Sequence, residues 1–318
     1  MTAPHRIDTH HHIFPTHYME KERERVLGVA HRLAPEILKW TPDAAVEALD
    51  RAGIATAVTS ISAPGVWFGD PRAARALSRD CNEYAVTMAQ DHRGRFGVFA
   101  ALPLPDVDGS LAEIEHAFDV LRADGIGLMT SYGDVWPGDE RLAPVFDELN
   151  RRKAVVYFHP TAASACANLL PGIPAATIEF PFDTTRAIAS LLFGGTLSRC
   201  PDIRFIFSHA GGALPMLAHR IAGLMRVRPD LLEKLPKGVM HEFTKLHYDV
   251  CSATSPIAFG AIRQLAGISQ LLYGTDFPYW PSETTGAGLA QLGLAAAELR
   301  AVERDNALRL LPRLARSA

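Results

Sequence analysis

Cysteine is scarce in this sequence of 318 residues. The chain has four, Cys81, Cys166, Cys200 and Cys251, and no two of them form a Cys-x-x-Cys pair. Such wide spacing provides neither a thiolate metal site nor a disulfide framework. Because thiols stay reduced inside the cell, we expect a cytoplasmic protein.

Long apolar runs and blocks of one charge are also missing. The N-terminus enters charged and histidine-rich sequence at once, and no segment holds the roughly 18 uninterrupted apolar residues of a membrane span. Lys and Arg total 32 against 35 Asp and Glu, which gives a net charge of −3 without a basic cluster. We therefore expect neither nucleic acid nor a membrane as a partner.

Alternating strand and helix patterns dominate what is present. The first strand enters the run His10-His11-His12, and short apolar, β-branched runs recur along the rest of the chain, at 54–61, 96–101, 126–129, 154–158, 203–207, 246–250 and 270–273. Helical patterns separate these runs, the first of them with Thr41 as N-cap and Pro42 at its first position. About eight strand–helix repeats predict a closed parallel (β/α)8 TIM-type barrel.

The rival fold is a doubly wound open sheet. It ranks second because no Gly-x-Gly-x-x-Gly loop follows the first strand and no phosphate loop is present. Without a linker or a repeat, residues 1–318 are expected to form one domain. Long excursions are expected after strands one and five: an irregular, charged stretch over 13–40, and an insertion that holds 179–185.

The histidine run at the N-terminus suggests a metal site. In an extended strand alternate side chains share a face, so Asp8, His10 and His12 should point one way and His11 the other. Two imidazoles that converge in this way can bind a divalent metal ion. The alternative is a surface or tag-like run, although a tag would not stand between Ile7 and Phe14.

Three further polar residues follow predicted strands. His159 comes after the fifth strand, His209 after the sixth and Asp276 after the eighth. Each alone has a structural explanation, as a loop cap, a core imidazole or a helix N-cap. In a parallel barrel, however, all of these strand ends open on one face, where active sites are built. Imidazoles and a carboxylate there could hold a metal with open positions, beside a histidine suited to proton transfer.

These residues resemble a known family. The His10-x-His12 pair, His159-Pro160 and the stretches 208–212 and 273–278, in this order, are similar to the decarboxylase branch of the amidohydrolase superfamily. That branch includes aminocarboxymuconate-semialdehyde decarboxylase and methylsalicylate decarboxylase. The resemblance implies a barrel with one divalent metal, Zn²⁺ before Mn²⁺, and a set of metal ligands formed by His10, His12, His159 and Asp276.

The resemblance also implies roles for two residues outside this set. His209 would lie close to the metal and act in proton transfer or water activation, and Arg220 would reach the substrate carboxylate of a neighbouring subunit. The Arg220 role implies a homodimer or a higher homo-oligomer. Hydrolytic branches often carry a lysine after the fourth strand that bridges two metals; residues 127–132 hold none, so we expect a single metal.

The function implied is that of a carboxy-lyase: non-oxidative release of CO₂ from a small aromatic or muconate-type carboxylic acid. The ring carbon needs a proton, which we expect Asp276 or His209 to deliver, although a metal-bound hydroxide is an alternative. One rival function is a metal-dependent hydrolase of a lactone, ester or amide. Another is a catalytically silent barrel, although none of the expected ligands is missing from the sequence.

Aromatic residues in the loops near the expected mouth suit a planar substrate. They are Trp67, Phe68, Phe180, Phe182, Tyr279 and Trp280. Each could equally be packed under a long loop. Trp67 and Phe182 are our candidates for substrate binding.

Overall fold

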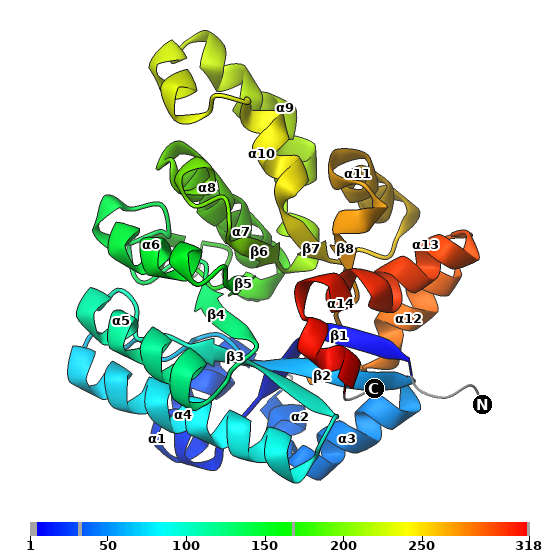
Figure 1. Ribbon diagram of the computed structural model, residues 1–318. Coiled ribbons are helices and arrows are strands. Elements are labelled where there is room, and N and C mark those ends of the chain that lie inside the picture. Colours follow the sequence, from blue (N-terminus) through cyan, green and yellow to red (C-terminus); the bar gives the residue numbers. More distant parts are fainter. Residues whose placement is uncertain (1–4, 31–33, 167–168, 317–318) are drawn as a thin grey trace.

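A computed structural model describes residues 5–30, 34–166 and 169–316. Eight parallel strands follow one another around a single sheet in the order β1 to β8, and helices surround them (Figure 1). This confirms the predicted (β/α)8 barrel and rules out the doubly wound alternative. None of the helices in the described ranges is long and apolar enough to cross a membrane.

The strands match the predicted runs closely. Their bounds are β1 Arg6–Ile13, β2 Ile54–Ile61, β3 Phe96–Ala101, β4 Gly125–Met129, β5 Val155–His159, β6 Arg204–Phe207, β7 His247–Asp249 and β8 Leu271–Leu272. Nearly every strand residue is buried, because each strand has the barrel interior on one face and helices on the other.

The helices lie outside the strands. Their bounds are α1 Thr16–Ala30, α2 Ala34–Leu38, α3 Pro42–Arg51, α4 Pro71–Asp91, α5 Val107–Glu115, α6 Ala143–Arg151, α7 Ala175–Phe193, α8 Thr196–Arg199, α9 Leu214–Gly223, α10 Val239–Lys245, α11 Pro256–Ala266, α12 Glu283–Ala290, α13 Ala296–Arg300 and α14 Asn306–Leu310. The side chain of Thr41 accepts a hydrogen bond from Ala44 N and caps α3, as its sequence predicts.

Backbone hydrogen bonds close the barrel between β1 and the segment that follows β8. Thr9 N donates to the carbonyl of Tyr273, and Asp276 N donates to the carbonyl of His10 at 2.8 Å. The last strand has only two residues, so these bonds carry the closure beyond it. They also fix Asp276 next to the histidine strand.

An apolar plug fills the N-terminal end of the barrel. Ile7, Phe99 and Tyr157 pack inside the strands, with the rings of Phe99 and Tyr157 stacked 5.4 Å apart. Leu311 and Leu314, from the end of the chain, join this cluster from below. The interior is therefore open to a ligand only at the carboxyl ends of the strands.

Long segments follow strands one and five as predicted, but both contain helix where the sequence suggested irregular chain. Between β5 and α7, the only helical turn in the described residues of 160–174 is a short 3-10 turn at Ser164–Cys166, whereas most of the remaining residues of the two segments are helical. Within residues 13–40, α1 and α2 occupy most of the stretch expected to be irregular. Residues 179–185 lie inside α7, which continues through Pro181. Proline cannot donate the helical hydrogen bond and usually ends a helix, which is why the sequence suggested a later start. The side chains of Thr184 and Thr185 bond to backbone carbonyls one turn earlier and support this segment.

Candidate metal centre

Four side chains from β1, β5 and the segment after β8 converge at the mouth of the barrel. One ligand atom of each of His10, His12, His159 and Asp276 lies within 4.8 Å of all the others. Nε2 of His10 and Nε2 of His12 are each about 3 Å from Oδ1 of Asp276, and Nε2 of His159 is 3.9 Å from it. All four residues are buried. The sequence places these residues together because all of them lie at the carboxyl ends of strands of one parallel barrel.

The spacing of the two β1 imidazoles fits a shared cation. Their Nε2 atoms are 3.1 Å apart, and two nitrogens bound at about 2.05 Å to one tetrahedral ion would be about 3.3 Å apart. Nδ1 of His10 faces Oδ2 of Asp249, and Nδ1 of His12 faces the carbonyl of Ser60. Those acceptors hold a proton on each Nδ1, so both Nε2 atoms are turned toward Oδ1 of Asp276. Two imidazoles and a carboxylate meet this closely because a positive charge, from a proton on His10 or from a bound cation, can lie between them.

The electrostatics of the cluster also favour a cation. Burial lowers the pKa of His12, and lowers the pKa of His159 well below its ordinary value, so both imidazoles are neutral and can act as ligands. Burial opposes charge on His10 as well, but Asp249 and Asp276 outweigh it and raise the pKa of His10 to about 10. The two carboxylates thus demand a positive charge at this point, which a divalent ion supplies when it is bound.

His209 lies on the other side of the same carboxylate. Its Nε2 is 3.2 Å from Oδ2 of Asp276, while its backbone N–H donates to Oδ1 of Asp249. Burial would raise the pKa of Asp276, but the nearby His10, His12 and His159 lower it well below its usual range. Asp276 is therefore a carboxylate that faces the other three residues of the set with one oxygen and His209 with the other.

The backbone is strained where these residues are presented. His209, Ala210, Ser252 and Asp276, which follow β6, β7 and β8, have φ between 53° and 59°. Residues other than glycine seldom adopt this left-handed conformation, and strain of this kind concentrates at functional sites. The sequence carries no signal for it.

Two aspartates organise the histidine strand. Asp249, the last residue of β7, contacts His10 and His209 as described above. Asp8 accepts hydrogen bonds from Nδ1 of His11 and from the backbone and hydroxyl of Thr275. The sequence placed Asp8 on the face of His10 and His12, but the register shifts between Asp8 and His11. Asp249 was missed; its signal was an acidic residue within an apolar strand.

A cavity of about 1070 Å³ opens above the cluster. His159, His209 and Asp276 line its floor, and the aromatic residues Phe180, Tyr279 and Trp280 line its walls. Among the described residues, its lining contains neither lysine nor arginine. The cavity can therefore hold an apolar, planar molecule whose only charged contacts are those of the ligand cluster.

The structure does not bring the three predicted substrate-binding residues into this lining. Trp67 is half-buried against the core rather than exposed in its loop, and Phe182 is 42% exposed on α7. Phe180 takes the wall position instead, because residues two apart on a helix face different ways. Arg220 is exposed on α9, away from the cavity of its own chain. Their roles stay predictions.

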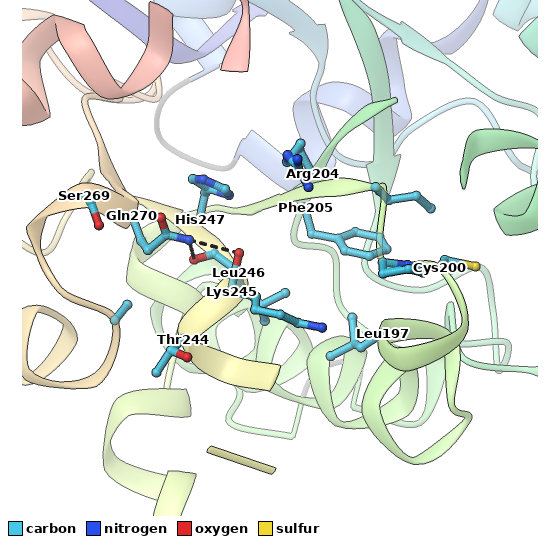
Figure 2. A pocket seen from close by; sticks show the side chains of 13 residues that line it. Leu197, Cys200, Arg204, Phe205, Thr244, Lys245, Leu246, His247, Ser269 and Gln270 are labelled. Atoms are coloured by element: carbon cyan, nitrogen blue, oxygen red, sulfur yellow. Dashed lines mark hydrogen bonds between the residues drawn. The ribbon is translucent and has the colours of Figure 1, made fainter. Parts of the chain in front are cut away.

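A second cavity, of about 440 Å³, lies at the opposite end of the barrel, where β6, β7 and β8 begin. Figure 2 shows Arg204, Lys245 and His247 there, and Gln270 donating to two backbone carbonyls. Helices α10 and α11 end at this cavity, so the charges of Arg204 and Lys245 offset the negative ends of those helices. We assign this cavity a structural role.

Comparisons with known proteins find a family match and several decarboxylases of similar sequence. The family described as amidohydrolase matches residues 7–313. The decarboxylase yanB of Aspergillus niger is 33% identical over 97% of this chain and 88% of its own length. The 6-methylsalicylic acid decarboxylase acuB of Aspergillus aculeatus is 33% identical over 98% and 97%.

A solved structure gives the same fold at lower identity. It is that of a 5-carboxyvanillate decarboxylase from Novosphingobium aromaticivorans with bound manganese and a nitrobenzoic acid. It is 18% identical, with a TM-score of 0.87 over 96% of this chain and 97% of that one. The strand order and the barrel found here are thus shared with a manganese-containing protein.

Proposed function

The chain belongs to the amidohydrolase family, and we infer that it is a metal-dependent decarboxylase, a carbon–carbon lyase that releases CO₂ from an aromatic carboxylic acid. In this reaction the bond between the ring and the carboxyl carbon breaks, and the ring carbon keeps the electron pair and takes up a proton. The observation that carries the inference is that three imidazoles and one carboxylate converge at the base of a largely apolar cavity.

We propose that His10, His12, His159 and Asp276 hold one divalent ion. Three nitrogen donors and one oxygen suit Zn²⁺, which is the ion expected from the sequence, and Mn²⁺ is the alternative because a structural relative contains it. When bound, the ion supplies a positive charge that polarises and orients the substrate oxygens. Two of these four residues, His159 and Asp276, line the cavity, so an ion held by the set would be reached by a substrate in the cavity.

The proton is assigned to the pair formed by Asp276 and His209. Oδ2 of Asp276 and Nε2 of His209 are 3.2 Å apart, and both residues line the cavity. A proton shared between these atoms lies on the substrate side of the cluster, where the ring carbon must receive it. Asp249 fixes the backbone of His209 and so keeps the imidazole at this position.

The proposed substrate is an ortho-hydroxybenzoate. A muconate-type acid carries a second carboxylate, and the cavity has no lysine or arginine among its described lining residues to bind it. A ring with one carboxylate and one adjacent hydroxyl places both oxygens at the ligand cluster and leaves its apolar edge against Phe180 and Tyr279. A relative in sequence, the decarboxylase acuB, is named for an acid of this class, 6-methylsalicylic acid.

The oligomeric state is proposed to be a homodimer or a higher homo-oligomer. Arg220 is exposed on α9, outside the lining of its own cavity, and forms no ion pair within the described part of the chain. It is therefore available to contact a substrate bound in a neighbouring subunit. A cytoplasmic location, which the four free cysteines suit, also stays a prediction.

A direct assay tests the proposed function. Purified protein loaded with Zn²⁺ or Mn²⁺ is mixed with 6-methylsalicylate, and CO₂ and 3-methylphenol are measured. We expect both products in equal amounts, and neither after the metal has been removed by a chelator. Ring opening of a lactone, with no CO₂ from any hydroxybenzoate, would instead favour the hydrolase function.

A further inference from the structure

The cavity is much larger than a single-ring substrate needs. Its volume of about 1070 Å³ is slightly above the range of roughly 300–1,000 Å³ that is typical of pockets that enclose drug-sized ligands. A benzene ring with a carboxylate, a hydroxyl and a methyl group is far smaller than such a ligand. A ring held at the ligand cluster would therefore leave much of the cavity unfilled.

The unfilled part lies toward α9 and α11 and is apolar. Pro215 and Met216 line it from α9, and Ile257, Ala258 and Ala261 line it from α11. Apart from His159, His209 and Asp276, none of the described lining residues is a histidine or an acidic or basic residue. Polar groups of a substrate would find few partners in this region, whereas methylene groups would be removed from water.

We call the region lined by Pro215, Met216, Ile257, Ala258 and Ala261 the apolar arm of the cavity. Ala258 and Ala261 are three residues apart and so face the same way, and their small side chains leave space beside α9. Farther out, Met216 is 76% exposed and Ile257 is 83% exposed. These apolar side chains line the same cavity as His159, His209 and Asp276, and a chain attached to a ring bound at those residues could lie against them.

Resting on the decarboxylase function proposed above, we propose that this arm binds an extended alkyl substituent of the substrate. The preferred substrates are then ortho-hydroxybenzoates that carry a chain of several carbons next to the carboxylate, in the position of the methyl group of 6-methylsalicylate. The bond between ring and carboxylate breaks, CO₂ leaves, and the ring carbon takes the proton shared by Asp276 and His209. The product is a 3-alkylphenol, and the chain itself takes no part in the chemistry.

A substrate series tests this proposal with the metal-loaded enzyme. The acids are 6-methyl-, 6-propyl-, 6-pentyl- and 6-heptylsalicylate, and kcat/KM is measured for each. We expect kcat/KM to rise by about 4-fold for each added methylene, the factor that corresponds to burial of one CH₂, until the chain reaches the rim. Values that stay flat or fall with chain length overturn the substituent proposal but leave the decarboxylase function intact. Failure of every acid, including the methyl compound, refutes the decarboxylase function.

A pair of variants, one that fills the arm and one matched control outside it, tests the same proposal. Ala261→Phe places a ring in the arm, and Gln264→Phe adds the same ring at an exposed position of α11 outside the cavity. The ratio of kcat/KM for the heptyl acid to that for the methyl acid should fall at least 10-fold in Ala261→Phe and stay at its wild-type value in Gln264→Phe. An unchanged ratio in both variants overturns the proposal.

A milder variant and a binding measurement cover the case in which Ala261→Phe does not fold. Ala261→Leu is mixed with 3-heptylphenol and 3-methylphenol, and calorimetry gives the affinity of each product. We expect selective loss of affinity for the heptyl compound. If light scattering instead finds fewer subunits in this variant, with the two affinities lowered equally, the apolar arm is a subunit contact and the proposal is wrong.

Discussion

Oδ2 of Asp249 lies 3.0 Å from Nδ1 of His10, and both side chains are fully buried. The other oxygen of Asp249 accepts from the backbone N–H groups of His209 and Cys251. One carboxylate therefore orients a proposed metal ligand and positions the residue proposed to share the proton. Carboxylate–imidazole contacts of this kind fix the tautomer and strengthen the metal bond.

The first expected outcome concerns Asp249. Asp249→Asn keeps the size of the side chain but removes the charge that holds the proton on Nδ1 of His10, so metal affinity should fall about 10- to 100-fold. Competition with a fluorescent chelator measures it. Asp202→Asn, an exposed change, is the control. Equal metal affinities of the two variants would show that Asp249 does not support metal binding by His10.

The second concerns the proton. His209→Asn leaves the four proposed ligands in place, so metal content should stay at wild-type level while kcat falls about 100- to 10,000-fold. Mass spectrometry of the metal and steady-state kinetics give the two numbers. Wild-type kcat in this variant would assign the proton to another group, and lost metal would mean that His209 is a ligand.

The third separates two neighbouring phenylalanines. Phe180 lines the cavity beside His159, with ring centroids 6.3 Å apart, whereas Phe182 is largely turned to solvent. Phe180→Ala should raise KM for an aromatic acid about 10-fold, because an aromatic contact and its buried area are lost. Phe182→Ala should change KM less than 2-fold. The reverse order would mean that a second subunit covers Phe182 and closes the mouth.

The fourth concerns acid stability. Burial, together with Arg204 and Arg309, lowers the pKa of His247 to about 4. In the unfolded chain His247 has a pKa near 6.5, so below that pH the unfolded chain binds a proton that the folded chain does not. This residue therefore lowers the free energy of unfolding as the pH falls from about 6.5 to 4, by up to about 3 kcal/mol. Above about pH 6.5 it has no such effect.

Replacement of His247 should therefore flatten the loss of stability on the acid side. Urea unfolding of the wild type, of His247→Phe and of the exposed control His219→Phe is compared at pH 7 and pH 5. The drop in unfolding free energy between the two values should be smaller for His247→Phe alone. The same drop in all three proteins would show that His247 is not responsible.

The sequence was sufficient to predict the barrel and the meeting of four polar residues at its mouth, because both depend on local signals. Apolar runs fix where strands occur, and polar residues directly after them must meet at one end of a parallel barrel. Neither step requires knowing in which direction a given side chain points. That is why His10, His12, His159 and Asp276 could be placed together across most of the chain.

The cavity walls and the supporting contacts could not be predicted in this way. Which aromatic residue faces the substrate depends on where α7 begins, and the helix runs through Pro181 against the usual effect of proline. The role of Asp249 depends on a contact between strands seven and one, and the direction of Asp8 depends on an irregular register. These features arise from tertiary packing rather than from any short stretch of sequence.

The central claim is that four residues hold one divalent ion at the mouth of the barrel. Anomalous X-ray diffraction from crystals of the metal-loaded protein tests it most directly, since the signal locates the ion without reference to activity. We expect one strong peak about 2.0–2.2 Å from Nε2 of His10, His12 and His159 and from Oδ1 of Asp276. A peak at another place, or none between these four atoms, would contradict the account.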